Sequence, residues 1–298
     1  MSAITAFLDA RFAELQRGWY ERGMASLVEG LTEFRLTLPD SAWAKGVLPA
    51  CRQHRLDSLL LEDPFTRRAR ERPRGYAGDA VMMDYMYFRE PPSPCSDIGQ
   101  QVFAFLTDSP NAASVRWRRE HIASLINAEV RQRKTLSVLG VACGHCREGL
   151  LLSNEAMLAI SRYDVLDQDD ESLEVIGRTL PGHIKPKKLA AQALGEQQEL
   201  CGFDFVYSAG LYDYLDEPQA AALTKVLVER TAPGGTVLVA NFTQDNWGRG
   251  YMEAFMNWRL VLRTRDDMRR LVPATGVAGS ALYFDPYRNA IYLKILRA

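Results

Sequence analysis

The feature that most constrains this chain is an alternation of short apolar runs with helix-like segments from residue 134 onward. Five such runs occupy residues 136–141, 163–167, 187–191, 203–208 and 236–242. Short apolar runs separated by helical patterns are typical of buried parallel strands. Two more strands are expected at 280–284 and 290–295, joined by turn residues. The pattern predicts an α/β, doubly wound domain whose sheet is covered on both faces.

The first 133 residues show helical periodicity instead. Apolar residues recur every three or four positions near the N-terminus and again from about 39 to 61. A loop rich in Arg, Pro and Gly is expected from Asp63 to Asp79. Further helical patterns cover about 80–88, 97–108 and 112–134. We therefore predict two parts, a helical N-terminal or lid region over 1–133 and a sheet domain over 134–298.

Composition narrows the range of partners. The 298 residues carry 36 Lys and Arg against 37 Asp and Glu, a net charge of -1, so no basic excess points to nucleic acid. No apolar run is long enough for a membrane helix, and the N-terminal segment lacks the basic start of a signal peptide. Five sparse cysteines predict reduced thiols in a cytoplasmic protein. The expected partner is a small molecule, and self-association as a homodimer is left open.

A small-residue loop ends the first expected strand. Gly140, Ala142 and Gly144 would let a ligand approach the backbone, although any short turn into a helix also favours small residues. Asp167 ends the second strand, where a carboxylate can accept both hydroxyls of a ribose. The chain lacks both Gly-x-Gly-x-x-Gly in this loop and a Walker-type Gly-Lys-Ser/Thr. A nucleoside ligand without phosphates fits better, and S-adenosylmethionine (SAM) is the common one.

Four segments carry a family resemblance. They are Val138-Leu-Gly-Val-Ala-Cys-Gly144, Leu166-Asp-Gln-Asp169, Phe203-Asp-Phe-Val-Tyr-Ser-Ala-Gly-Leu-Tyr-Asp-Tyr-Leu215 and Thr231-Ala-Pro-Gly-Gly-Thr-Val-Leu-Val-Ala-Asn-Phe242. In this order they resemble the class I SAM-dependent methyltransferases, with their seven-stranded Rossmann-like sheet. Together with Pro73-Arg-Gly-Tyr-Ala-Gly-Asp79, they resemble a bacterial subset that includes the enzymes making 3-hydroxypalmitate methyl ester signals. The resemblance covers roughly residues 64–298.

The resemblance implies a set of cofactor contacts. Gly140, Ala142 and Gly144 would line the methionine portion of SAM, and Asp167 would take the ribose hydroxyls. The remaining implied contacts are Gln168, Gln192 and Ala193 around the adenine, and Ser208, Ala209 and Gly210 beneath the sulfonium.

Cys143-Gly-His-Cys146 supports a rival hypothesis, because it matches the dithiol motif of disulfide-exchange proteins. The preceding Ala142 is not aromatic, and the alternating pattern is larger than a thioredoxin unit. The first Cys also stands where a nucleotide-binding loop needs a small residue. A metal site is not expected, because no second Cys or His pair stands at ligand spacing.

The acceptor side is less defined. Asp213 is the candidate general base, with a helix cap as its alternative role, and the neighbouring Tyr212 is a second catalytic candidate. Tyr76, in the glycine-containing loop before Asp79, is the third and would belong to a lid. His145 suits positioning rather than chemistry. Trp247, Tyr251, Trp258 and Arg263 follow the fifth strand, where their spacing suits core packing first and an apolar acceptor pocket second.

Two groups of arginines could meet anions. Arg119 shares a helical face with Val115 and Ile122, with Arg118 at its border, and a buried guanidinium requires an anionic partner. The SAM carboxylate and a structural Asp or Glu are equal candidates. The arginines between 67 and 74 suit a solvated face or, as the minority interpretation, a site for an anionic acceptor.

These observations predict a SAM-dependent methyltransferase that transfers a methyl group to a carboxylate or hydroxyl oxygen of a small molecule. Carbon and nitrogen acceptors stay open. The alternatives are a dithiol oxidoreductase and a SAM-responsive binding protein without turnover.

Overall fold

The computed structural model describes residues 3–298, so the first two residues of the N-terminal segment discussed above lie outside it. The chain forms two compact units. Unit 1 comprises the residues up to Val115 together with Asn246–Arg259, and unit 2 comprises Arg116–Asp245 and Leu260–Ala298. This division differs from the predicted boundary at residues 133 and 134. A continuous helix, α9 (Pro110–Gln132), spans the first crossing, so no break in the sequence pattern marks it.

Unit 1 is helical, as expected. Its helices are α1 (Ala3–Gln16), α2 (Tyr20–Thr37), α3 (Asp40–Ala42), a π-helical turn (Trp43–Val47), α4 (Leu48–Gln53), α5 (Arg55–Leu60), α6 (Pro64–Glu71), α7 (Ala80–Phe88), α8 (Asp97–Thr107), the start of α9, and α13 (Arg249–Ala254). The prediction of a loop throughout 63–79 was wrong, because α6 occupies half of it. Asp63 begins α6 by accepting from the backbone N–H of Phe65 and Thr66, with Pro64 in the first turn.

Unit 1 is completed by α13, a segment far away in sequence. Tyr251 and Phe255 are fully buried, and the Tyr251 hydroxyl lies 2.9 Å from Thr66 Oγ1. Gly250 allows the close approach, because a Cβ there would overlap the backbone of Leu31 on α2. Trp258 is buried as well. The aromatic residues after the fifth strand therefore serve core packing, the first of the two roles expected.

The arginines between 67 and 74 also serve this unit. Arg68 binds Asp79 with both nitrogens at 2.8–3.0 Å, and Arg70 binds both Asp57 oxygens at 2.6 and 3.0 Å. Arg70 and Arg72 also donate to the backbone carbonyls of residues 255 and 257, beyond α13. Internal pairing with carboxylates and carbonyls thus accounts for Arg68, Arg70 and Arg72, whereas Arg67 is exposed.

Unit 2 confirms the predicted fold class. Its seven-stranded sheet has the order β3-β2-β1-β4-β5-β7-β6. The strands are β1 (Leu136–Val141), β2 (Ile160–Asp167), β3 (Ile184–Lys188), β4 (Phe203–Ser208), β5 (Thr231–Phe242), β6 (Val277–Phe284) and β7 (Ala290–Arg297). The first five are parallel, and β7 runs antiparallel to both of its neighbours. The order reverses at β1, so a ligand crevice is expected at the carboxyl ends of β1 and β4.

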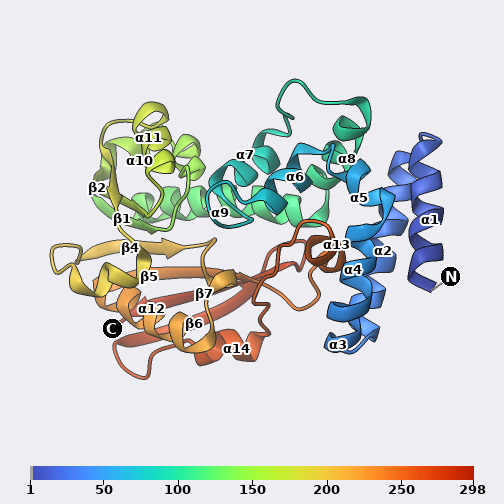
Figure 1. Cartoon of the computed structure of the whole chain (residues 1–298). Helices are drawn as coiled ribbons and strands as arrows, with labels where there is room; N and C mark the ends of the chain where they lie inside the picture. Colours follow the sequence, from blue (N-terminus) through green and yellow to red (C-terminus); the bar gives the residue numbers. More distant parts are fainter. Residues whose placement is uncertain (1–2) are drawn as a thin grey trace. The chain divides into compact units, whose positions relative to one another are not determined.

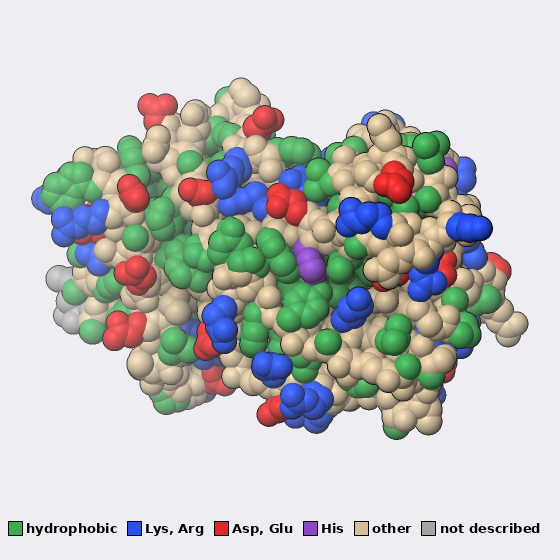
Figure 2. All heavy atoms as spheres, turned by 180° about the vertical axis from the view of Figure 1, so that it is seen from behind, with side chains coloured by type: hydrophobic (Ala, Val, Ile, Leu, Met, Phe, Trp, Pro, Cys, Tyr) green, Lys and Arg blue, Asp and Glu red, His purple; other side chains and the backbone are tan. Residues whose placement is uncertain are grey.

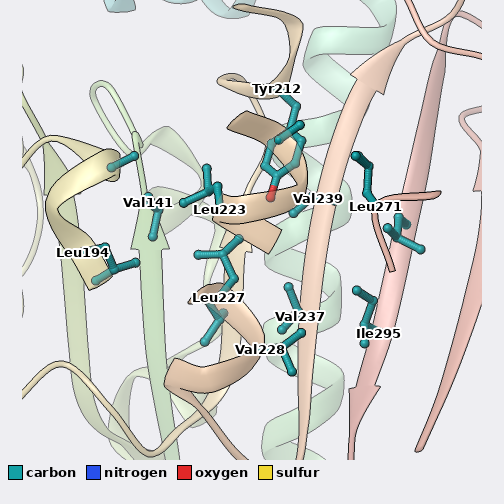
Figure 3. Close-up of a cluster of buried hydrophobic side chains, with 14 of the residues drawn as sticks. Val141, Leu194, Tyr212, Leu223, Leu227, Val228, Val237, Val239, Leu271 and Ile295 are labelled. Atoms are coloured by element: carbon teal, nitrogen blue, oxygen red, sulfur yellow. The ribbon is translucent and has the colours of Figure 1, made fainter. Parts of the chain in front are cut away.

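Helices cover both faces of this sheet (Figure 1). The rest of α9, with α10 (Asn154–Ala159) and α11 (Asp170–Thr179), packs on one face, and α12 (Glu217–Arg230) and α14 (Arg265–Arg270) pack on the other. Figure 3 shows the aliphatic cluster between α12 and the sheet, where Leu223, Leu227 and Val237 meet. Short 3-10 helices at Arg147–Leu151, Ala191–Glu196 and Tyr212–Tyr214 follow β1, β3 and β4.

The surface carries charges of both signs. On the face drawn in Figure 2, Lys and Arg side chains are interspersed with Asp and Glu, and hydrophobic side chains gather between them. Among the described residues, no helix has the length and apolar character to cross a membrane.

Candidate functional site

The site begins at the loop after β1, whose backbone adopts a costly shape. Ala142, Gly144 and Cys146 all have left-handed conformations, with φ of 54°, 54° and 48°. Only Gly adopts this region freely, and other residues pay roughly 1–2 kcal/mol. The loop turns the Gly144 N–H toward β2, where it donates to Asp167 Oδ2 at 2.7 Å. This hydrogen bond joins the two sequence features from which a nucleoside site was predicted.

Asp167 is buried at the end of β2. Its other oxygen accepts from the Asp169 N–H at 3.0 Å, and among residues 3–298 it has no ion-pair partner. Burial raises the pKa of this carboxyl, although the two N–H donors oppose the shift. Each carboxylate oxygen has two lone pairs, so each can accept one more hydrogen bond. The side chain therefore fits a neighbouring diol.

The carboxyl end of β4, the strand next to β1 in the sheet, supplies further polar groups. Ser208 is fully buried, and its hydroxyl oxygen has no hydrogen-bond partner among the described residues. Orphaned buried hydroxyls are rare and usually mark a missing partner. Arg118 on α9 donates to the Ala209 carbonyl at 2.6 Å, and a Cβ on Gly210 would lie 3.8 Å from its guanidinium. Residues 208–210 thus place polar groups at the carboxyl end of β4, where the crevice is expected.

Arg118 reaches the backbone of this segment. The sequence pattern placed it only at the border of the buried stripe. A long side chain at a border position can still extend into a site, and periodicity does not report that. The predicted Arg119 lies 3.8 Å from the exposed Glu120 carboxylate on the same helix, and its binding of the SAM carboxylate stays a prediction.

Gly140 has a different role from the one implied by the resemblance. A Cβ at this position would overlap Cys143 Sγ and lie 2.8 Å from the Tyr207 hydroxyl. The space that this glycine leaves is therefore filled by the protein's own side chains. Ala142 and Gly144 remain the loop residues available to line a ligand, and both are half-buried.

Tyr212 is not placed for catalysis. Its side chain is fully buried in the aliphatic cluster of Figure 3, and its hydroxyl lies 2.9 Å from Thr224 Oγ1 on α12. Tyr212, in the short 3-10 helix that follows β4, thus points into the core. Arg263 is also structural, because it donates to the carbonyls of residues 212 and 215 at 2.7 Å.

Asp213 lies at the same end of the sheet as Ser208. Its Oδ1 accepts from the Phe242 N–H at 2.7 Å, at the end of β5, so it does not cap a helix. Burial raises its pKa to about 6, against the opposing charges of Arg118 and Arg263. A carboxylate with this pKa can take up a proton near neutral pH.

The remaining predicted residues lie around this edge or in unit 1. Gln168 follows β2 and is exposed, and Gln192 and Ala193 follow β3 in a 3-10 helix, exposed and half-buried. His145 is buried within the loop. Tyr76 is half-buried in unit 1, in the segment between α6 and α7, and its catalytic role stays a prediction.

The Cys143 environment does not favour disulfide exchange. Burial raises the pKa of the Cys143 thiol well above its ordinary value, aided by the neighbouring Cys146 and Glu148. Exchange requires a thiolate, and reactive motifs of this kind have lowered thiol pKa values. Across residues 3–298, no group of three or more His, Cys, Asp or Glu side chains is arranged to hold a metal ion.

No family model and no curated protein matches the sequence. Solved structures do match the fold. The chain is 17% identical to a possible exported protein from Bordetella parapertussis, with a TM-score of 0.62 over 87% of this chain and 97% of that one. It is 15% identical to the SAM-dependent methyltransferase SibL, with a TM-score of 0.53 over 98% and 96%.

A third similar structure contains a bound ligand. Magnesium protoporphyrin IX methyltransferase (ChlM) from Synechocystis PCC 6803, solved with S-adenosylhomocysteine (SAH), is 11% identical with a TM-score of 0.51 over 78% of this chain and all of that one. At these identities the similarity shows the fold, which is the Rossmann-like fold of class I methyltransferases.

Proposed function

We propose that this protein is a SAM-dependent methyltransferase that acts on a small molecule. The observation that carries the proposal is the 2.7 Å hydrogen bond between Gly144 N–H and Asp167. It brings a small-residue loop and a buried carboxylate together at the switch point of the sheet, where such folds bind nucleosides. No pyrophosphate motif accompanies them.

The residues present fit the cofactor. Asp167 would accept the ribose hydroxyls, Ser208 would regain a partner for its orphaned hydroxyl, and Arg118 would pair with the methionine carboxylate. The neighbouring Arg119, considered for this role from the sequence, stays a second candidate for it. Bound SAM would supply an electrophilic methyl group on its sulfonium.

The chain's own contribution to the reaction is alignment. In-line displacement gains most of its rate from holding the two reactants in the reactive geometry. We propose an oxygen acceptor, which agrees with the resemblance to the enzymes making 3-hydroxypalmitate methyl esters. A carboxylate acceptor needs no base, whereas for a hydroxyl acceptor Asp213 would take the proton, and the rate would rise with pH through about 6. A cytoplasmic location and a homodimer stay predictions.

Titration calorimetry with SAH tests the proposal. We expect micromolar binding, weakened at least about tenfold in Asp167→Ala because two hydrogen bonds to a carboxylate are lost. Asp170→Ala is the matched control, because its exposed carboxylate binds only Lys188. Undetectable binding of SAH and SAM to the wild-type protein at millimolar concentration would overturn the proposal.

A further inference from the structure

Five polar side chains meet beneath the loop after β1, and the proposed reaction uses none of them. They come from the loop, from the 3-10 helix after it, and from the neighbouring strands β2 and β4: Cys143, Cys146, Glu148, Tyr163 and Tyr207. The apolar side chains between α9–α11 and the sheet surround this group, which we call the subloop network. Burying this much polarity is costly unless every group is hydrogen-bonded.

The Tyr207 hydroxyl is the centre of the subloop network. It donates to Glu148 Oε1 at 2.5 Å, and it lies 2.7 Å from the Tyr163 hydroxyl. The sulfurs of Cys143 and Cys146 each lie 3.7 Å from it. Because its one proton is directed to Glu148, the other three groups can meet it only as donors, and its two lone pairs accept at most two of them at a time. A single oxygen therefore connects the loop to both strands.

Glu148 determines in which direction the Tyr207 hydroxyl donates its proton. The carboxylate is buried, and among the described residues it has no ion-pair partner within 4 Å. Burial raises its pKa, and the Tyr207 hydrogen bond opposes that shift. A carboxylate placed here accepts the Tyr207 proton and thereby turns the phenol lone pairs toward the thiols. Removing the phenol oxygen would take one hydrogen-bond donor from the buried Glu148 and one partner from each thiol, while Cys146 would keep its contact with Tyr163.

The subloop network holds the part of the loop that contacts Asp167. Cys143 and Cys146 flank Gly144, whose N–H donates to that carboxylate. The loop contains three left-handed residues, two of them not glycine, so its shape needs external restraint. Gly140 leaves the space that the subloop network occupies, because any side chain there would collide with Cys143 and the Tyr207 hydroxyl.

We propose that Tyr207 is a positioning residue that, together with Glu148, holds the Ala142–Cys146 loop in its ligand-binding shape through the two cysteine thiols. The part of this inference that concerns affinity rests on the proposed function, whereas the part that concerns loop shape does not. The cysteines thus serve as hydrogen-bond donors inside the protein. This role accounts for a Cys-Gly-His-Cys motif in an environment unsuited to disulfide exchange.

The test compares Tyr207→Phe with Tyr283→Phe. Both remove one phenol oxygen from the same face of the sheet, but the Tyr283 hydroxyl contacts His121, outside the subloop network. Hydrogen–deuterium exchange of the ligand-free protein reports loop shape, and calorimetry reports the Kd for SAH. Glu148→Gln serves as the conservative variant, because its amide oxygen still accepts from Tyr207.

In Tyr207→Phe we expect amide exchange over residues 142–148 to be at least about tenfold faster, and the Kd for SAH to rise by about tenfold. Saturating SAH should restore protection, because the ligand then orders the loop. Tyr283→Phe should leave both quantities unchanged, and Glu148→Gln should lie between Tyr207→Phe and the wild type. Unchanged loop exchange in Tyr207→Phe would overturn the inference, as would a melting temperature loss with exchange raised equally throughout unit 2. Faster loop exchange without any SAH binding by the wild type would support loop positioning and refute the proposed cofactor.

Discussion

The two units differ in how most of their buried carboxylates are paired. In unit 1, Asp57 and Asp79 each bind an arginine with both oxygens, and Glu253 contacts Arg35 and Arg249. In unit 2, Asp164 likewise pairs with Arg162 and Lys187. By contrast, Glu148, Asp167 and Asp213 of unit 2 accept from backbone N–H groups, a phenol and a thiol, without an ion-pair partner among the described residues. Their pKa values are all raised by burial.

The difference separates carboxylates that hold two segments together from carboxylates that keep lone pairs available for neutral donors. A carboxylate locked to a guanidinium satisfies itself and holds two segments together. A buried carboxylate without a cation costs stability and keeps unused lone pairs, which is typical of functional sites. Asp63 is the exception in unit 1, because it is buried at the start of α6 without an ion-pair partner among the described residues, and its pKa is raised to about 7.

The largest expected effect concerns an arginine-paired carboxylate of unit 1 and the free energy of unfolding. Asp79→Ala removes the Arg68 pair and the cap of α7 together, so we expect a loss of about 4 kcal/mol in the free energy of unfolding. Asp79→Asn keeps a capping oxygen and should lose distinctly less. The measurement is urea unfolding, with the exposed pair variant Glu174→Ala as the control. Equal losses in Asp79→Ala and Glu174→Ala would show that the pairing is not structural.

An effect that is smaller per pH unit should come from Asp63, whose environment is like that of the unit 2 carboxylates. Its folded pKa of about 7 lies above the ordinary 3.8, so the folded protein binds the extra proton between these values. The free energy of unfolding should therefore fall as pH rises from about 4 to about 7, by at most about 1.4 kcal/mol per pH unit, and level off above. Asp63→Asn keeps a capping oxygen and should remove this slope in chemical unfolding measured across pH. An unchanged slope in the variant would assign it to other groups.

The smallest effect near neutral pH concerns ligand binding. The ionised Asp167 accepts hydrogen bonds better than the protonated form, and its pKa is raised. The Kd for SAH should therefore increase as pH falls, beginning at a higher pH than for an ordinary Asp and approaching about tenfold per pH unit below its pKa. Calorimetry from pH 8 downward measures this, with Asp167→Asn expected to bind weakly and independently of pH. A pH-independent wild type would show that Asp167 does not contact the ligand.

Much of unit 2 could be predicted from the sequence, because strand periodicity and the position of Asp167 are local signals. The carboxyl ends of β1, β2 and β4 fell where the apolar runs stopped. Arg118 was placed only at the border of a buried stripe, because its reach depends on side-chain length rather than on helical phase. The role of Tyr207 could not be predicted, because an aromatic residue within an apolar run is expected to be a core residue. Its hydroxyl approaches the loop after β1 only once the strands are arranged in the sheet.

The helix α6 was missed for a related reason. Five arginines within eight residues look like a solvated loop until their partners are known, and those partners stand at positions 57, 79, 255 and 257. The division into units could not be predicted either. The helix α9 continues across the boundary at residue 115, and residues 246–259 belong to unit 1 although they follow the fifth strand.

Residues 246–259, which complete unit 1, determine when this unit can fold during synthesis. When residue 115 leaves the ribosome, the first unit still lacks Tyr251 and Phe255, which fill the middle of it. Nascent chains fold as their segments emerge, but a core can close only when all its parts are available. Translation must therefore pass α13 before the earlier-synthesised helices of unit 1 can reach their final packing, and any stop codon upstream of α13 would leave their interior open to proteases.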